Sequence, residues 1–308
     1  MKTIYPKALQ KGDTIGVIAP ASKPLQANIE KAMKIYEEMG LQVLLSEHLT
    51  DGFGYLSAED SHRIKALEEM FLNDEVKGIF CACGGYGTPR IVDQIRYDLI
   101  KENPKVFWGY SDITCLHTAI YQQTGLVTFH GPMMSSDLAN EVDSLTMAGL
   151  KQIMSPTALT LEEQDQPVTS LQDGYVKGPL IGGNLTLLSS LIGSPYEINA
   201  KGALLFLEEI EEEPYRIDRM LNQLRLAGIL DDAAGFVIGD FNQCTPKKRH
   251  RSLRLEDVFD HYLNRSGKPC IRGFPIGHCM PVYSIPYGAQ ATLDTHKKTV
   301  TIEAGTRE

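Results

Sequence analysis

The first half of the chain alternates short apolar segments with segments of helical periodicity, and this alternation constrains the fold more than any other feature. Short apolar runs occupy 14–19, 41–45, 78–83 and 106–108. Each run is bounded by glycine, proline or polar residues, which is typical of buried strands. Strands that alternate with helices form a mostly parallel sheet with helices on both faces. We therefore predict an α/β fold whose N-terminal part is a doubly wound, mostly parallel sheet.

Helices are expected between these strands, at 29–39, 62–72 and 91–100, where apolar residues recur at helical spacing. A polar stretch rich in Glu, Gln and Asp then interrupts the pattern at 161–172. Such a composition is typical of a segment between domains.

The chain therefore divides into two expected domains. We expect an N-terminal α/β domain at 1–160, a linker at 161–177 and a smaller, mixed α/β C-terminal domain at 178–308. In the second domain, the apolar runs at 203–207 and 235–239 predict further strands.

The charge balance and the hydropathy pattern exclude several classes of partner. The 308 residues carry a net charge of -9 and the pI is near 5.4, so neither nucleic acid nor an anionic membrane surface is an expected partner. There is no run of about 18 apolar residues, and residues 1–7 lack the apolar core of a secretory signal. The 6 cysteines include no Cys-x-x-Cys pair. We expect a cytoplasmic protein with reduced thiols and no metal site.

The segment GYSDIT at 109–114 directly follows an apolar strand and precedes a helical pattern. This order predicts a sharp strand-to-helix turn with Ser111 at the mouth of the helix. A nucleophilic serine needs this placement, because its Oγ must be exposed and backbone N–H groups must lie nearby to hold an oxyanion. The alternative is a helix N-cap, since Ser and Asp are both favoured there.

The glycine-rich segment GGYG at 84–87 also follows a strand. It differs from a dinucleotide-binding loop, because its spacing is not Gly-x-Gly-x-x-Gly and it does not lie on the first strand-to-helix turn. Two interpretations remain. The segment is a plain tight turn, or its backbone N–H groups form a cradle for an oxyanion or a carboxylate.

Two adjacent glutamates, Glu208 and Glu209, end the apolar strand at 203–207 and begin the acidic run at 208–213. Most of this run is expected to be a solvated cluster before a helix, where acidic side chains are favourable. One carboxylate at the end of the strand is a candidate to orient a catalytic histidine. Because side chains alternate along a strand, only one of the two glutamates can face a given site.

Three histidines are candidates for a catalytic role. His278 lies in a Gly-His loop context, whereas His117 and His130 lie near Ser111 in the sequence. His117 follows Ser111 by six residues on the same predicted helix, so it is expected to point away and to pack in the core. His130 is expected to support the site structurally. Spacing alone does not choose among the three.

Five motifs in order resemble those of the LD-carboxypeptidases, the serine peptidases that cut murein tetrapeptides. The motifs are GYSDIT at 109–114, HGPM at 130–133, GGNL at 182–185, LEE with PYRIDR at 207–219, and Gly-His at 277–278. The resemblance covers essentially the whole chain. The run CACGG at 81–85 is similar to that of the murein-peptide carboxypeptidases of bacilli.

The resemblance implies a Ser–His–Glu catalytic triad formed by Ser111, His278 and Glu208, with Glu209 left in the acidic run. It also implies an oxyanion hole made by the backbone N–H of Asp112 and that of Gly85.

Substrate-binding roles are implied for Gly84 and Asn184. Cys83 stands where many members of the family have arginine. A cation expected near the substrate is therefore missing.

The family's fold implies an active site in the cleft between the two domains, often within a homodimer. The implied reaction hydrolyses the amide between the L-centre of a diamino acid and a terminal D-alanine, during recycling of murein peptides and without a cofactor. Whether that diamino acid is lysine or meso-diaminopimelate is left open.

Three alternatives remain. A related self-immunity peptidase that cleaves a peptide-nucleotide antibiotic would have the same triad. An α/β-hydrolase esterase would show Gly-x-Ser-x-Gly, but Ile113 occupies the last position. A non-catalytic binding protein with two α/β lobes would use the same cleft without a reactive serine.

Overall fold

The structure is a computed structural model that describes residues 2–164, 166–248 and 251–308. The chain forms two compact units. Unit 1 comprises Met1–Thr157, Ser284–Gly288 and Ala304–Glu308, and unit 2 comprises Ala158–Tyr283 and Ala289–Glu303.

Unit 1 is built on a six-stranded sheet in the order β12-β5-β4-β3-β1-β2. Its strands are β1 (Thr14–Ile18), β2 (Gln42–Leu45), β3 (Val76–Cys81), β4 (Val106–Gly109), β5 (Thr128–His130) and β12 (Ile285–Tyr287). Strands β1 to β5 pair in parallel, and only β12 is antiparallel, to β5. The order reverses between β1 and β3, and ligands of such sheets bind beyond the carboxyl ends of the strands at that point.

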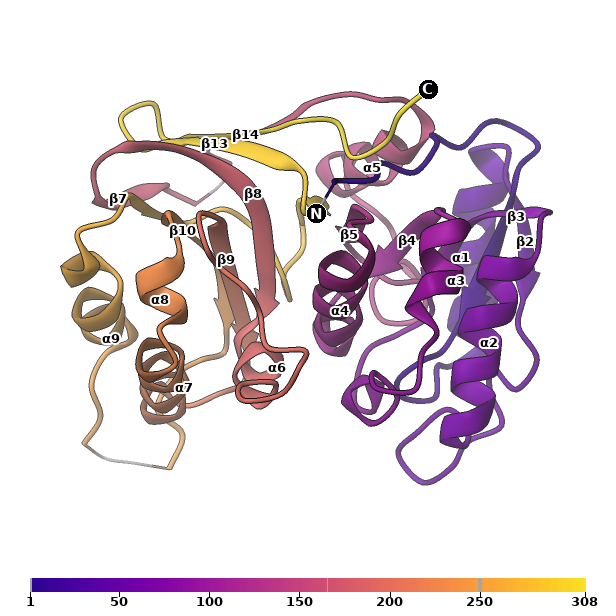
Figure 1. Cartoon of the computed structure of the whole chain (residues 1–308), viewed down its shortest axis with the longest axis horizontal. Helices are drawn as coiled ribbons and strands as arrows, with labels where there is room; N and C mark the ends of the chain where they lie inside the picture. The colour runs from indigo at the N-terminus through magenta and orange to yellow at the C-terminus, as the bar shows by residue number, and fades with distance from the viewer. Residues whose placement is uncertain (1, 165, 249–250) are drawn as a thin grey trace. The chain divides into compact units, whose positions relative to one another are not determined.

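Helices cover both faces of this sheet. On one face the core includes α1 (Gln26–Glu38) and α5 (Ser144–Lys151), and on the other α2 (Asp60–Leu72), α3 (Tyr97–Glu102) and α4 (Thr114–Thr124). Side chains of β1 alternate between the two cores, with Ile15 and Val17 in one and Ile18 in the other. The predicted doubly wound, mostly parallel sheet is therefore confirmed (Figure 1).

The helix expected at 91–100 is largely wrong. A short 3-10 turn, Thr88–Arg90, precedes this segment, and α3 begins only at Tyr97. Ile91 and Ile95 are buried in the core without lying in a helix. The spacing of the apolar residues in this segment therefore reflects their burial in the core and not a helix.

Unit 2 contains an eight-stranded mixed sheet in the order β6-β14-β13-β8-β9-β10-β11-β7. Its strands are β6 (Leu159–Leu161), β7 (Thr169–Gln172), β8 (Tyr175–Asn184), β9 (Leu204–Ile210), β10 (Gly235–Asn242), β11 (Cys270–Arg272), β13 (Gln290–Asp294) and β14 (Thr299–Ile302). The long, curved β8 joins the two halves of the sheet (Figure 1), because its first half pairs antiparallel with β13 and its second half pairs in parallel with β9.

The helices of unit 2 lie between or after the parallel strands. They are α6 (Leu185–Ser190), α7 (Pro214–Leu226), α8 (Ile229–Asp232) and α9 (Leu255–Tyr262). Helix α7 packs against α6, α8 and α9 through buried residues on one face, including Ile217, Leu221 and Leu224. Pro214 begins α7 at a position where its missing N–H costs nothing.

The structure differs from the expected linker at 161–177. This segment contributes β7 and the beginning of β8 to the sheet of unit 2. Strands β6 and β7 are the two edge strands of that sheet. The polar residues that indicated a linker, among them Glu162, Glu163, Gln164 and Gln166, lie in the connection between these two strands, within unit 2. In addition, the chain returns to unit 1 at 284–288 and 304–308.

In the part of the chain that the structure describes, no helix is both long enough and apolar enough to cross a membrane.

Candidate functional site

The turn after β4 holds Ser111 in a left-handed backbone conformation. Its φ is 64°, at the start of the 3-10 turn Ser111–Ile113 that leads into α4. Such a φ costs a residue with a Cβ about 1–2 kcal/mol. Gly109 makes the approach to this turn possible, since a Cβ there would lie 2.9 Å from Cβ of Cys81. A strained serine between a strand and a helix is the geometry of a nucleophile elbow.

The capping interpretation of Ser111 does not describe this turn. The N-cap positions of the 3-10 turn and of α4 are Tyr110 and Ile113, and neither makes a side-chain capping bond. The Asp112 carboxylate instead accepts a hydrogen bond from another loop.

The glycine-rich loop at 84–87 lies directly against Ser111. A Cβ at Gly84 would lie 2.9 Å from Cβ and 3.1 Å from Oγ of Ser111. At Gly85, whose φ is 104°, a Cβ would overlap the side chain of Ser22. The Ser22 Oγ accepts a hydrogen bond from the backbone N–H of Tyr86 at 3.1 Å. The backbone of this loop, rather than a side chain, is therefore presented to the serine, as an anion cradle requires.

A clasp formed by Thr88 and Asp112 joins the glycine-rich loop to the serine turn. The backbone N–H of Thr88 donates to Oδ2 of Asp112 at 2.8 Å, and its hydroxyl donates to the Asp112 carbonyl at 2.5 Å. Asp112 is only 2% exposed, and burial raises the pKa of its carboxyl despite the hydrogen bonds from Thr88 and Gly87. The role of Thr88 is not predictable from the sequence, because a threonine after a glycine-rich turn carries no distinctive signal.

Arg63 of α2 holds the same loops from within the core. Its guanidinium donates to the carbonyls of Pro20 and Gly87, the latter at 3.0 Å, and pairs with Asp60 at 2.6 Å. Although charged, Arg63 is only 2% exposed. Asp60 also pairs with Arg90 at 2.8 Å, and hydrogen bonding to Arg90 is the main reason that the pKa of Asp60 is lowered. The sequence did carry a signal for Arg63. This arginine lies one helical turn before Leu67, on the face of α2 that is buried.

Glu208 and His278 form a hydrogen-bonded pair in unit 2. The Nδ1 of His278 lies 2.6 Å from Oε2 of Glu208, whose side chain is 0% exposed, while that of His278 is 13% exposed. Gly277 permits this approach, because a Cβ there would lie 2.6 Å from Cβ of Glu208. The Asn242 amide donates to the His278 carbonyl at 2.6 Å and fixes the loop. A buried carboxylate that holds one imidazole nitrogen is the arrangement of a triad acid and base.

The side chain of Glu209 lies on the face of β9 opposite to that of Glu208 and has a structural role. Its carboxylate accepts from the Asn184 amide at 2.9 Å, from the Thr186 N–H at 2.8 Å and from the Thr186 hydroxyl at 2.7 Å. Glu209 is 2% exposed, so its expected place in a solvated acidic cluster is wrong. Burial raises the pKa of Glu209.

Asn184, a candidate for substrate binding, lies at the N-cap of α6. Its Oδ1 accepts from the N–H of Leu187 at 3.2 Å while its amide donates to Glu209. These two bonds give Asn184 a structural role in the connection between β8 and α6.

The two histidines near Ser111 lie in the core of unit 1. Nε2 of His117 is 2.7 Å from the Gly109 carbonyl, and its Nδ1 is 2.8 Å from the hydroxyl of Thr128. Burial lowers the pKa of His117 to about 4, so it is neutral near pH 7. His130 is 1% exposed and packs edge-on against the Tyr110 ring at 5.5 Å. His117 is a buried core residue, as expected, and its contact with the Gly109 carbonyl also holds the end of β4. His130 packs beside the residue that precedes Ser111.

Within residues 2–164, 166–248 and 251–308, no cluster of three His, Cys, Asp or Glu side chains is arranged to hold a metal ion.

Comparison with known families gives two matches along the chain. Residues 15–131 match the N-terminal domain of the LD-carboxypeptidases, and residues 177–293 match the C-terminal domain of the same family. The first match contains Ser111, and the second contains Glu208 and His278.

Individual proteins are similar over nearly the whole chain. A Bacillus subtilis protein named "Probable murein peptide carboxypeptidase" is 53% identical, covering 98% of this chain and 95% of its own. The structure of an MccF-like protein from Bacillus anthracis matches with a TM-score of 0.89 and 30% identity, over 98% of this chain and 100% of its own. A muramoyltetrapeptide carboxypeptidase from Oxalobacter formigenes matches with a TM-score of 0.83 and 28% identity, over 94% and 97% respectively.

The backbone strain at Ser111 predicts an unusual order of stability between two variants that both lack the hydroxyl. Ser111→Gly is expected to be more stable than Ser111→Ala by about 1 kcal/mol, because only glycine adopts a positive φ without strain. Urea unfolding measures the difference. At Ser190, which ends helix α6, the order should reverse, since alanine is the better helix former. Equal stability of the two Ser111 variants would contradict the strain.

Removal of the Arg63 guanidinium is expected to destabilise unit 1. Arg63→Met leaves the buried Pro20 carbonyl without its donor, removes one of the two donors to the Gly87 carbonyl and breaks the ion pair with Asp60. It should lower the free energy of unfolding by about 3 kcal/mol. The matched control is Arg96→Met, which removes an ion pair with Glu68 whose arginine side chain is 59% exposed. That control should cost less than about 1 kcal/mol. Equal losses in the two variants would show that Arg63 has no special role.

Proposed function

Because the chain belongs to the LD-carboxypeptidase family, we propose that it hydrolyses murein tetrapeptides through a triad of Ser111, His278 and Glu208. The observation that carries this proposal is the 2.6 Å contact between Nδ1 of His278 and the fully buried carboxylate of Glu208. A carboxylate held in this way orients an imidazole and stabilises its protonated form. The strained turn at Ser111 supports the choice of nucleophile.

The reaction begins with Ser111. A hydrogen bond donated by Nδ1 to Glu208 fixes the tautomer in which Nε2 of His278 carries the lone pair. Nε2 takes the proton of the Ser111 hydroxyl as Oγ attacks the carbonyl of the scissile amide. The backbone N–H groups of Asp112 and Gly85 stabilise the oxyanion that forms. The clasp of Thr88 and Asp112 supports this assignment, because it fixes the loop that carries Gly85.

The second half of the reaction releases the products. Protonated His278 gives its proton to the leaving amine, and D-alanine departs while the rest of the peptide stays as an ester on Ser111. Water then attacks the ester carbonyl while His278 takes its proton. The bond to Oγ breaks, His278 returns the proton to Ser111, and the shortened peptide leaves with a free carboxylate. Glu208 accepts the hydrogen bond from Nδ1 and stabilises the imidazolium. No step requires a cofactor.

The substrate class follows from the relatives. The Bacillus subtilis relative is named for murein peptides, and at 53% identity over 98% of this chain it makes them the favoured substrate. The scissile bond joins the L-centre of a diamino acid to a terminal D-alanine. We place this activity in the cytoplasm, in recycling of peptidoglycan fragments, with a homodimer as the working form.

A self-immunity peptidase that cleaves a peptide-nucleotide antibiotic is the second candidate. It is favoured by the match to an MccF-like protein, at 30% identity, and by an Escherichia coli relative named "Microcin C7 self-immunity protein MccF", at 26% identity over 96% of this chain. Incubation of the protein with murein tetrapeptides and with a peptidyl nucleotide, followed by mass spectrometry of the products, separates the two. Release of D-alanine from the tetrapeptides alone supports the proposal, whereas cleavage of the nucleotide conjugate alone overturns it.

Loss of the nucleophile is expected to abolish turnover. Ser111→Ala should lower kcat for a murein tetrapeptide by about 10^6-fold, as for other triad nucleophiles. Ser190→Ala, at an exposed position in α6, serves as the control and should retain wild-type activity. More than a few per cent of activity in purified Ser111→Ala would rule out Ser111 as the nucleophile.

Substitution of each of the two adjacent glutamates is expected to change kcat by a very different amount. Glu208→Gln should lower kcat by about 10^4-fold, because the amide cannot stabilise the imidazolium. Glu209→Gln should change kcat only a few-fold, and its main effect should be lower stability, since it places an amide among the donors of Asn184 and Thr186. Rates are compared per mole of folded protein. The reverse pattern would assign the triad acid to Glu209.

A further inference from the structure

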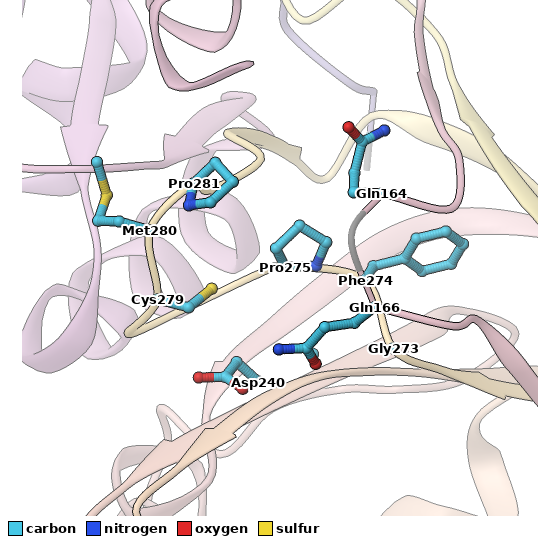
Figure 2. Close-up of a pocket in the computed structure, with 10 residues that line it drawn as sticks. Gln164, Gln166, Asp240, Gly273, Phe274, Pro275, Cys279, Met280 and Pro281 are labelled. Atoms are coloured by element: carbon cyan, nitrogen blue, oxygen red, sulfur yellow. The ribbon is translucent and has the colours of Figure 1, made fainter. Parts of the chain in front are cut away.

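Unit 2 contains a cavity of about 180 Å³ beside the loop that carries His278 (Figure 2). It is lined by residues at the end of β10, by Gln164 and Gln166, and by the loop at 273–281. The lining residues on which the argument depends are Gln164, Gln166, Asp240, Pro275, Cys279 and Met280. Cys279 follows His278 directly, so the cavity is adjacent to the proposed catalytic base.

Asp240 gives the cavity its charge. Among the residues that the structure describes, the lining contains no lysine, arginine or histidine, and Asp240 has no ion-pair partner. The half-buried carboxylate is held by the N–H of Phe241, and the Asp240 N–H donates to the Ile276 carbonyl at 2.8 Å. Burial, and then the charge of Glu208, raise the pKa of Asp240, whereas His278 lowers it. A cation bound here would relieve the burial of the carboxylate.

The rest of the lining suits an aliphatic stem. Pro275, Met280 and Pro281 provide apolar surface along the same cavity. An apolar wall beside a single carboxylate matches a side chain that has methylene groups and ends in an ammonium. The volume suits one such side chain, because pockets for whole drug-sized ligands occupy roughly 300–1,000 Å³.

We propose that this cavity is a specificity subsite that binds the side-chain ammonium of the substrate's diamino acid, with Asp240 as its charge partner. The inference rests on the proposed function, since it assigns a place to one residue of that substrate. Lysine and meso-diaminopimelate share this ammonium. The second also carries a carboxylate on the same carbon, for which the amides of Gln164 and Gln166 are the donors in the lining.

The test uses three synthetic tetrapeptides that end in D-alanine and differ only at the third residue, which is lysine, meso-diaminopimelate or norleucine. Norleucine keeps the aliphatic stem and lacks the ammonium. The measured quantity is the ratio of kcat/KM for each diamino peptide to kcat/KM for the norleucine peptide. Because all three peptides use the same catalytic groups, the ratio cancels any effect of a variant on the triad itself.

In Asp240→Asn this ratio should fall by about tenfold or more, since hydrogen bonds to charged groups discriminate by that much. Asp240→Glu, which keeps the charge, should retain a ratio above that of Asp240→Asn. Asp231→Asn, an exposed aspartate in α8, is the matched control and should keep the wild-type ratio.

The outcomes separate the subsite from the proposed function. If the wild-type protein hydrolyses the peptides and Asp240→Asn keeps the wild-type ratio, the subsite is wrong and the function stands. If the wild-type protein hydrolyses none of the three, the proposed function itself fails. A fall confined to the lysine peptide or to the diaminopimelate peptide supports the subsite and identifies the diamino acid that it accepts.

Discussion

The left-handed backbone of Ser111 is the constraint on which the architecture of unit 1 depends. A φ of 64° at a residue with a Cβ persists only where the surrounding structure holds it. Three loops beyond the carboxyl ends of β1, β3 and β4 do so. Arg63 binds the first two through the carbonyls of Pro20 and Gly87, and the Thr88–Asp112 clasp joins the second to the third. The cost of the strained turn is offset by hydrogen bonds that are themselves buried.

In unit 2, two neighbouring carboxylates on β9 are both buried and have different partners. Glu208 meets His278, whereas Glu209 meets Asn184 and Thr186. The pleat of the strand sends the two side chains to opposite faces, so each can be buried with its own set of donors. An acidic run thus supplies one residue for the proposed chemistry and another for the connection between β8, β9 and α6. Asp240, at the end of the next strand, adds a third carboxylate to this region.

Much of the fold of unit 1 could be predicted from sequence, because its strands are buried on both faces and read as continuous apolar runs. Apolar spacing gave a wrong prediction at 91–100, where Ile91 and Ile95 are buried but do not lie in a helix. In unit 2 the edge strands β6 and β7 are short and a polar connection joins them, so the segment resembled a linker. Pairing with β14 and β11, distant in sequence, is what orders them. Ser111 and His278 could be predicted as candidate site residues, because each lies in a distinctive loop sequence. Arg63 and Thr88 could not be predicted in this way. Arg63 depends on backbone carbonyls, and Thr88 on the Asp112 carboxylate, that come near only in the folded chain.

Covalent labelling shows whether Ser111 is an activated nucleophile. A fluorophosphonate probe reacts with serines that a neighbouring base activates. Intact-mass measurement should show a single adduct per chain, and peptide mapping should place it on Ser111. No adduct on the native protein, or an adduct on another serine, would contradict the account, and the former would favour a binding protein without a reactive serine.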